Sequence, residues 1–173
     1  SLSSWVYIHG QPENFKESYS QDTNILNYNG KPKITYNMRH RKLKISMENI
    51  AKDSDVDIEA DDYIYDKEKV LNAYYKEKIK GDVIFEYDNF LLQKWNNIVV
   101  SYANGTLDIF INGELVKSFL NVVPEMNSTS VFSGHNGGLR GYICNIVYYP
   151  QYLSLKRIKT NYEALKDNSP PVI

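Results

Sequence analysis

Alternating carboxylates between residues 53 and 59 are the side chains whose types and spacing could do chemistry. Asp55, Asp57 and Glu59 occupy every second position, and Asp53 extends the series. On a β-strand such positions project from one face, so these carboxylates would lie side by side. Two carboxylates about 5 Å apart can act as nucleophile and acid in a retaining glycosidase. The same oxygens are hard ligands of the kind that calcium binds.

The surrounding residues favour a solvated acidic loop over either site. The charge continues through Glu59-Ala60-Asp61-Asp62, and no aromatic cluster surrounds the run to stack a sugar. An EF-hand loop beginning at Asp53 would place Ile58 at its sixth position, where glycine is required. We therefore predict no catalytic residue and no cofactor. Calcium stays open as the alternative, with these ligands: Asp53, Asp55, Asp57 and Glu59.

The loop at 134–140 and the tyrosines after the last strand supply the candidate binding residues. Tyr149 and Tyr152 can stack on a sugar ring or pack against a protein partner. His135 and Arg140 lie in the loop that leads into the last strand. We predict that a glycan or protein ligand contacts these four residues.

Other aromatic side chains are expected to be structural. Tyr142 and Tyr148 lie on an apolar alternating strand, which predicts core positions. Trp95 and Trp5 are predicted to pack between the sheets. Cys144, the single cysteine, is interpreted as a small buried hydrophobic residue and not as a reactive thiol.

The elements that must position these residues are short strands. Asn104-Gly105 and Asn112-Gly113 are hairpin signals, because type I′ turns need positive φ at both central positions. Between them Leu107, Ile109 and Ile111 alternate with polar residues and Phe110, which predicts the middle strand of an antiparallel meander. Further strands are expected at 5–8, 23–28, 34–37, 43–47, 83–87, 130–133 and 142–149. The last is predicted to be central, because both of its faces are apolar.

A short amphipathic helix is predicted near the C-terminus. Ser154 has the chemistry of an N-cap. The apolar residues that follow form one helical stripe: Leu155, Ile158, Tyr162 and Leu165. We predict one sandwich domain over 1–166, with an insertion at 51–82 that contains a second helix near 66–80, and an exit linker over 167–173.

Composition limits the partners of this 173-residue chain. Its net charge of −1 and pI of about 6.3 provide no basic field for nucleic acid. No apolar run reaches the ~20 residues of a membrane span, so we expect a membrane link only through an anchor outside this sequence. One cysteine favours a virion or an intracellular, reducing compartment.

Two motifs in this order resemble the laminin-G-like and concanavalin A-like lectin/glucanase superfamily. The first is Trp95 to Lys117, in which tryptophan opens a strand before Gly-Thr-Leu-Asp-Ile-Phe-Ile-Asn-Gly-Glu-Leu-Val. The second is the glycine-led strand 141–149, followed by Leu153-Ser154 and Ile158 at the spacing of that superfamily's helix start. The hairpins within 5–8 and 26–47 look similar to the version in large DNA viruses of eukaryotes.

The resemblance implies a jelly-roll sandwich of two curved antiparallel sheets. For function it implies a non-catalytic structural or adhesion module, associated with a virus particle and a protein partner. A carbohydrate-binding module, with or without calcium, is the alternative. The run 55–59 also resembles the Glu-x-Asp-x-Glu strand of laminarinase-type glycoside hydrolases, with Asp replacing the first Glu, and we rank that activity last.

Overall fold

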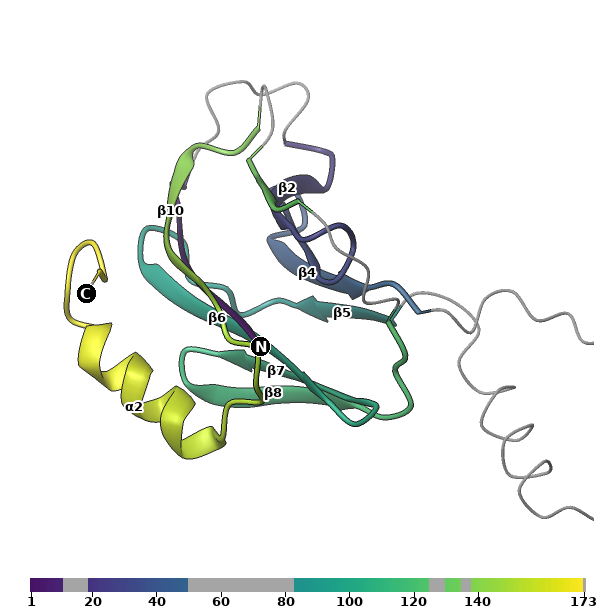
Figure 1. Cartoon of the computed structure of the whole chain (residues 1–173). Helices are drawn as coiled ribbons and strands as arrows, with labels where there is room; N and C mark the ends of the chain where they lie inside the picture. Colours follow the sequence, from purple (N-terminus) through teal and green to yellow (C-terminus); the bar gives the residue numbers. More distant parts are fainter. Residues whose placement is uncertain (11–18, 50–82, 125–129, 135–137, 173) are drawn as a thin grey trace, which may run out of the picture.

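A computed structural model describes residues 1–10, 19–49, 83–124, 130–134 and 138–172 of the chain. Two five-stranded antiparallel sheets face each other, and a single described helix lies outside them (Figure 1). Sheet A has the order β10-β1-β6-β7-β8, and sheet B has the order β5-β4-β3-β2-β9. The predicted antiparallel sandwich with one short C-terminal helix is confirmed.

The elements follow the predicted positions to within a few residues. Sheet A contains β1 (Leu2–Ile8), β6 (Trp95–Ala103), β7 (Thr106–Ile111), β8 (Glu114–Phe119) and β10 (Gly141–Tyr148). Sheet B contains β2 (Thr23–Asn27), β3 (Lys33–Asn37), β4 (Lys42–Met47), β5 (Val83–Tyr87) and β9 (Phe132–Ser133). Helix α2 spans Leu155–Leu165.

The two Asn-Gly pairs form the predicted hairpin turns between β6, β7 and β8. Asn104 and Gly105 have φ values of 49° and 79°, and Asn112 and Gly113 have 53° and 80°. Both residues of each turn are therefore left-handed, as a type I′ turn requires. These turns make β7 the middle strand of a meander, in agreement with the prediction.

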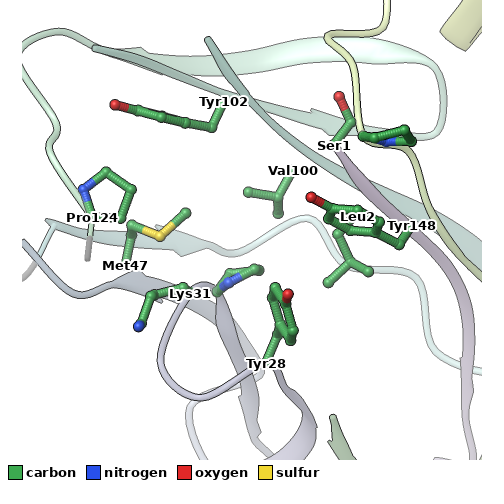
Figure 2. A pocket seen from close by; sticks show the side chains of 11 residues that line it. Ser1, Leu2, Tyr28, Lys31, Met47, Val100, Tyr102, Pro124 and Tyr148 are labelled. Atoms are coloured by element: carbon green, nitrogen blue, oxygen red, sulfur yellow. The ribbon is translucent and has the colours of Figure 1, made fainter. Parts of the chain in front are cut away.

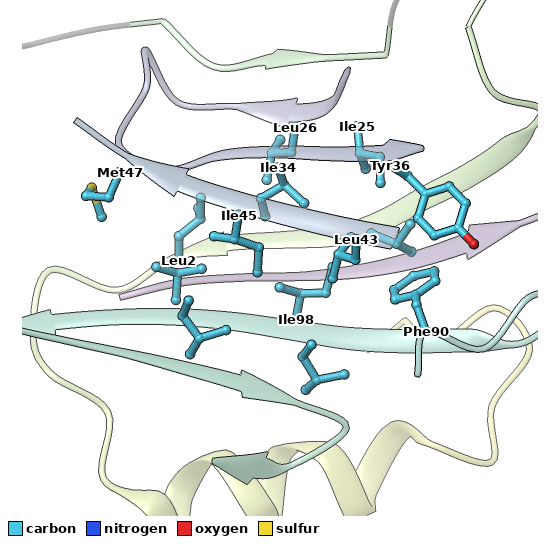
Figure 3. Close-up of a cluster of buried hydrophobic side chains, with 14 of the residues drawn as sticks. Leu2, Ile25, Leu26, Ile34, Tyr36, Leu43, Ile45, Met47, Phe90 and Ile98 are labelled. Carbon is cyan, nitrogen blue, oxygen red and sulfur yellow. The ribbon is translucent and has the colours of Figure 1, made fainter. Parts of the chain in front are cut away.

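The main core lies between the sheets, where alternate residues of facing strands meet (Figure 3). Leu2 and Ile98 project from sheet A toward Leu26 and Ile45 of sheet B. All four are buried, as the period of two along a strand predicts. Because one face of sheet A lies in this core, its other face points outward, where it meets helix α2 and solvent.

Helix α2 covers part of the outer face of sheet A (Figure 1). Ile158 is buried in a second apolar cluster with Val99 and Phe110 of the sheet. The helix begins as predicted, because the backbone N–H of Arg157 donates to Ser154 Oγ at 3.4 Å.

Strand β10 is an edge strand and not the predicted central strand. Its pairing with β1 shifts register between Ser3 and Trp5, and Asn145 has a φ of 49°. Bulges of this kind are common at sheet edges, where they interrupt pairing with further strands. The predicted core positions of Tyr142 and Tyr148 are wrong for the same reason, since their side chains are 61% and 56% exposed.

Both tryptophans lie on the outer face of sheet A, so their predicted position between the sheets is wrong. Val6 and Ile98 belong to the core between the sheets, and neighbouring residues alternate across a strand. Trp5 is buried nonetheless, because its ring stacks on Tyr162 of α2 with centroids 5.6 Å apart. Trp95 lies beyond the helix and is half-buried.

Several predictions concern residues outside the described ranges. These are the acidic run, the insertion with its helix, and His135. The one helix within the described ranges, α2, is too short to cross a bilayer.

Candidate binding site

Three aromatic side chains form a row across the outer face of sheet A. Tyr142 of β10 pairs with Tyr7 of β1, which in turn pairs with Trp95 of β6. Residues directly opposite each other on neighbouring strands project from the same face, so the three rings lie side by side. We call these three residues the aromatic row. It lies next to Trp5, on the part of the face that α2 leaves open.

The rings of the aromatic row pack against one another. Centroids are 5.5 Å apart for Tyr7–Trp95, 6.0 Å for Tyr7–Tyr142 and 6.5 Å for Trp95–Tyr142. These are contact distances for aromatic pairs, so no cation fits between the rings as it would in an aromatic cage. The ring planes are tilted by 36° to 59° relative to one another, so the row is a compact and uneven apolar surface.

An open hollow adjoins the aromatic row. Its volume is about 410 Å³, and the described residues that line it are His9, Gly10, Gln93 and Arg140. His9 belongs to both features, because its ring meets Tyr7 edge-on at 5.1 Å and Tyr142 at 5.4 Å. A ligand on the row can therefore extend into the polar hollow without leaving the protein surface.

Backbone hydrogen bonds hold the rim of the hollow to the sandwich. The N–H of His9 donates to the carbonyl of Arg140 at 2.9 Å, and the N–H of Gln93 donates to the carbonyl of Ile8 at 2.8 Å. Gln93 has a φ of 58°, a conformation that residues other than glycine, asparagine and aspartate seldom adopt. Three separate chain segments thus meet at one end of sheet A.

Cys144 lies close to the aromatic row but supplies no nucleophile. It pairs with Trp5 across the β1–β10 ladder, and its Sγ is 3.9 Å from the carbonyl oxygen of Pro171. Burial raises the pKa of the Cys144 thiol, which keeps the group protonated at neutral pH. The structure shows a half-buried cysteine, consistent with the structural interpretation.

The structure separates the predicted binding residues. Arg140 lines the hollow at the start of β10, whereas Tyr149 follows the end of that strand, on the order of 25 Å away along the chain. Tyr149 is half-buried against the second apolar cluster, and Tyr152 is exposed nearby in sequence. His135 lies outside the described residues, as do the proposed calcium ligands.

The predicted binding residues include no member of the aromatic row and only one of its neighbours, Arg140. The residues outside that prediction are Tyr7, His9, Gln93, Trp95 and Tyr142, of which Trp95 and Tyr142 were expected in the core. Alternation could have identified the outer-face positions, because Val6 and Ile98 in the core put Tyr7 and Trp95 outside. Their proximity depends on pairing between strands that are far apart in the sequence.

A second cavity lies between the sheets at the other end of β10 (Figure 2). Tyr28 and Tyr148, whose rings are 6.1 Å apart, lie on one side of it, and Met47, Tyr102 and Pro124 lie on the other. Its volume of about 80 Å³ is roughly half that of an apolar cavity that holds benzene, ~150 Å³. A sugar ring with its hydroxyl groups is larger still, so this cavity cannot enclose one.

The described residues offer no metal centre or pair of catalytic carboxylates at the hollow. No three histidine, cysteine or acidic side chains gather within metal-binding distance in the described ranges. The described lining of the hollow contains donors and an amide but no carboxylate.

Comparisons with family models and with curated proteins found no match. Among solved structures, the chain is similar to the botulinum neurotoxin serotype D binding domain (16% identity, TM-score 0.55). It is also similar to the type G receptor-binding domain (16%, 0.56) and to the binding domain of neurotoxin DC in complex with SialylT (17%, 0.51).

These matches cover 94%, 94% and 96% of this chain but only 36%, 37% and 35% of the matched chains, in the order given. The chain therefore spans little more than a third of their length. At this identity the likeness shows the fold alone. This chain has a β-sandwich of the kind that those binding domains contain.

Proposed function

We propose that this chain is a non-catalytic binding module that holds a glycan on the aromatic row. The observation that carries the proposal is the alignment of Tyr142, Tyr7 and Trp95 on an open face of sheet A. The C–H groups on one face of a sugar ring are apolar and its hydroxyls point outward. An exposed aromatic surface beside hydrogen-bond donors matches that division.

The exposure of Tyr142 supports a binding role. Its ring is 61% exposed although it contacts three other rings. A large aromatic ring in this position leaves apolar area in water that a ligand would remove. The adjacent hollow of about 410 Å³ falls within the usual ~300–1,000 Å³ of small-ligand sites.

A glycan array followed by calorimetric titration tests the proposal. Tyr142→Ala removes the exposed end of the aromatic row, and Tyr148→Ala removes a similarly exposed tyrosine from the other end of the same strand. We expect Tyr142→Ala to weaken binding about tenfold, the cost of losing one aromatic contact of ~1.4 kcal/mol. We expect Tyr148→Ala to bind as the wild type does.

Two outcomes would overturn the proposal. One is an array without signal for the wild-type protein, repeated with calcium and with chelator. The other is an equal loss of affinity in both variants, since that would place the ligand away from the aromatic row. A signal that disappears only with chelator would support the calcium alternative at Asp53, Asp55, Asp57 and Glu59.

The alternative partner is a protein within a virus particle. Its support is the resemblance of the N-terminal hairpins to the version found in large DNA viruses, beside the resemblance of the Trp95 and Gly141 motifs to laminin-G-like and concanavalin A-like domains. Under this proposal the chain, as one domain over 1–166, is a component of the particle. Mass spectrometry of purified particles should find its peptides, and their absence would remove the proposal.

A further inference from the structure

We propose that the site prefers glycans that carry a carboxylate, and that Arg140 binds this group. This inference rests on the proposed function, because it assigns the chemistry of the ligand on the aromatic row. It also predicts the orientation of the bound glycan, with the acidic sugar at the hollow and the neighbouring sugar on the aromatic row.

The described lining of the hollow is positively charged. It has one permanent cation, the Arg140 guanidinium, together with the Gln93 amide and the His9 ring. No aspartate or glutamate is among these lining residues. An arginine fork matches a carboxylate with two parallel hydrogen bonds, which a neutral hydroxyl cannot reproduce.

Arg140 already interacts with another part of the protein. A guanidinium has five N–H donors, so it can bind a ligand carboxylate beside an existing partner. Its side chain is exposed at the start of β10, and its backbone is fixed because its carbonyl accepts from the N–H of His9. The charged group is thus attached to a rigid edge of the sandwich.

Gln93 is exposed at the rim of the hollow, and its amide lies next to Gly10. A Cβ atom at Gly10 would be 3.0 Å from Gln93 Nε2, so a larger residue there would shift the amide slightly. Gln93 also has the left-handed φ of 58°, which costs free energy in a residue of this type. Strained residues of this kind concentrate at ligand sites, where they place a side chain accurately.

The extent of the aromatic row sets how much of the ligand it can hold. The ring centroids of its two outer members, Trp95 and Tyr142, are only 6.5 Å apart, so the three rings form a compact cluster that suits one sugar ring. His9 lies where the row meets the hollow, in contact with Tyr142. A disaccharide with its acidic unit at Arg140 therefore occupies both features at once.

Matched pairs of glycans test the inference. Each pair has the same linkage and differs only at C6, as cellobiose differs from glucuronosyl-β-1,4-glucose. The pairs are printed on one array, and the pairs that bind are measured by calorimetry at two salt concentrations. We expect the wild type to bind the carboxylated member about tenfold more tightly, as a charged hydrogen bond provides. The preference should shrink at high salt.

Arg140→Gln should reduce this preference to less than twofold. Arg157→Gln is the matched control, because it removes one exposed arginine from α2 and changes the net charge equally. The control should retain the full preference. Gly10→Ala should weaken binding of both members, because it displaces the Gln93 amide.

The outcomes separate this inference from the proposed function. Equal binding of both members by the wild type overturns the acidic preference, and an equal loss of preference in Arg140→Gln and Arg157→Gln overturns the role of Arg140. Either result leaves the glycan site standing. An array without signal for any pair overturns both. A preference that only Arg140→Gln removes supports both.

Discussion

The outer face of sheet A contains two tryptophans in opposite environments. Trp5 is 2% exposed and stacks on Tyr162 of helix α2, with ring planes 12° apart. Trp95 lies on the same face beyond the helix, half-buried and in contact with tyrosines of the aromatic row. The two halves of the face have similar side chains, and the difference between them is the cover that α2 provides.

This difference shows how the same residue type serves stability in one half and recognition in the other. Burying an aromatic ring during folding contributes a few kcal/mol to stability. An exposed ring gives a similar gain only when a ligand covers it, so the gain contributes to binding. Mutations in the covered half should therefore lower the unfolding free energy of the protein, and mutations in the open half should lower its affinity for the glycan. The predictions below test this division in order of decreasing effect.

Trp5→Ala should have the largest effect. It removes a buried indole from between β1 and α2, and such a deletion costs about 3–5 kcal/mol of unfolding free energy. Urea denaturation followed by circular dichroism measures the loss. A loss below ~1 kcal/mol would contradict the assignment of Trp5 to the covered half.

Gly113→Ala should disturb the fit of α2 without touching a core residue. A Cβ atom there would be 2.9 Å from Cδ1 of Tyr162, and the φ of +80° adds left-handed strain. We expect a loss of about 2–3 kcal/mol, the sum of strain and overpacking. The readout is urea denaturation, with Trp5 fluorescence in a Trp95→Phe background reporting the stack.

Gly105→Ala is the control for Gly113→Ala. Its φ is +79°, but no atom lies within 4 Å of the added Cβ. It should show only the left-handed strain of about 1 kcal/mol. Equal losses in both variants would mean that the helix moves freely away from the Gly113 turn.

Trp95→Ala should separate affinity from stability. We expect glycan affinity to fall about tenfold, equivalent to ~1.4 kcal/mol. The unfolding free energy should fall by no more than ~1.5 kcal/mol, because the ring is half-buried and its loss removes mainly aromatic pairs. If Trp95→Ala were as unstable as Trp5→Ala and bound the glycan normally at low temperature, Trp95 would serve stability as the residues of the covered half do.

The sandwich could be predicted from the sequence because its signals are local. Asn104-Gly105 and Asn112-Gly113 specify their turns by backbone conformation alone, and Ser154 specifies the start of α2 by one side-chain hydrogen bond. Strand alternation is equally local. These features can be predicted without knowing which strands pair with each other.

The candidate site could not be predicted because it depends on non-local pairing. Apolar residues on both faces of β10 predicted a central strand, but its outer face meets Tyr7, the C-terminal segment and solvent. Tyr142 and Trp95 are 47 positions apart in the sequence and become neighbours only through β1, which pairs with both of their strands. Arg140 was the one predicted residue that the structure places at the hollow.

Lys159→Ala should have the smallest effect, although Lys159 Nζ lies 3.1 Å from Glu114 Oε1 between α2 and β8. Both side chains are largely in water, so the ion pair should contribute less than ~0.5 kcal/mol, and less still at high salt. Ile158→Ala, one residue away and buried, should cost about 2–5 kcal/mol at any salt concentration. Urea denaturation at low and high salt compares the two variants. A loss above ~1 kcal/mol for Lys159→Ala that disappears at high salt would mean that charge attaches the helix. In that case ionic strength would control how much of the outer face α2 covers, and the boundary between the two halves would no longer be fixed by packing.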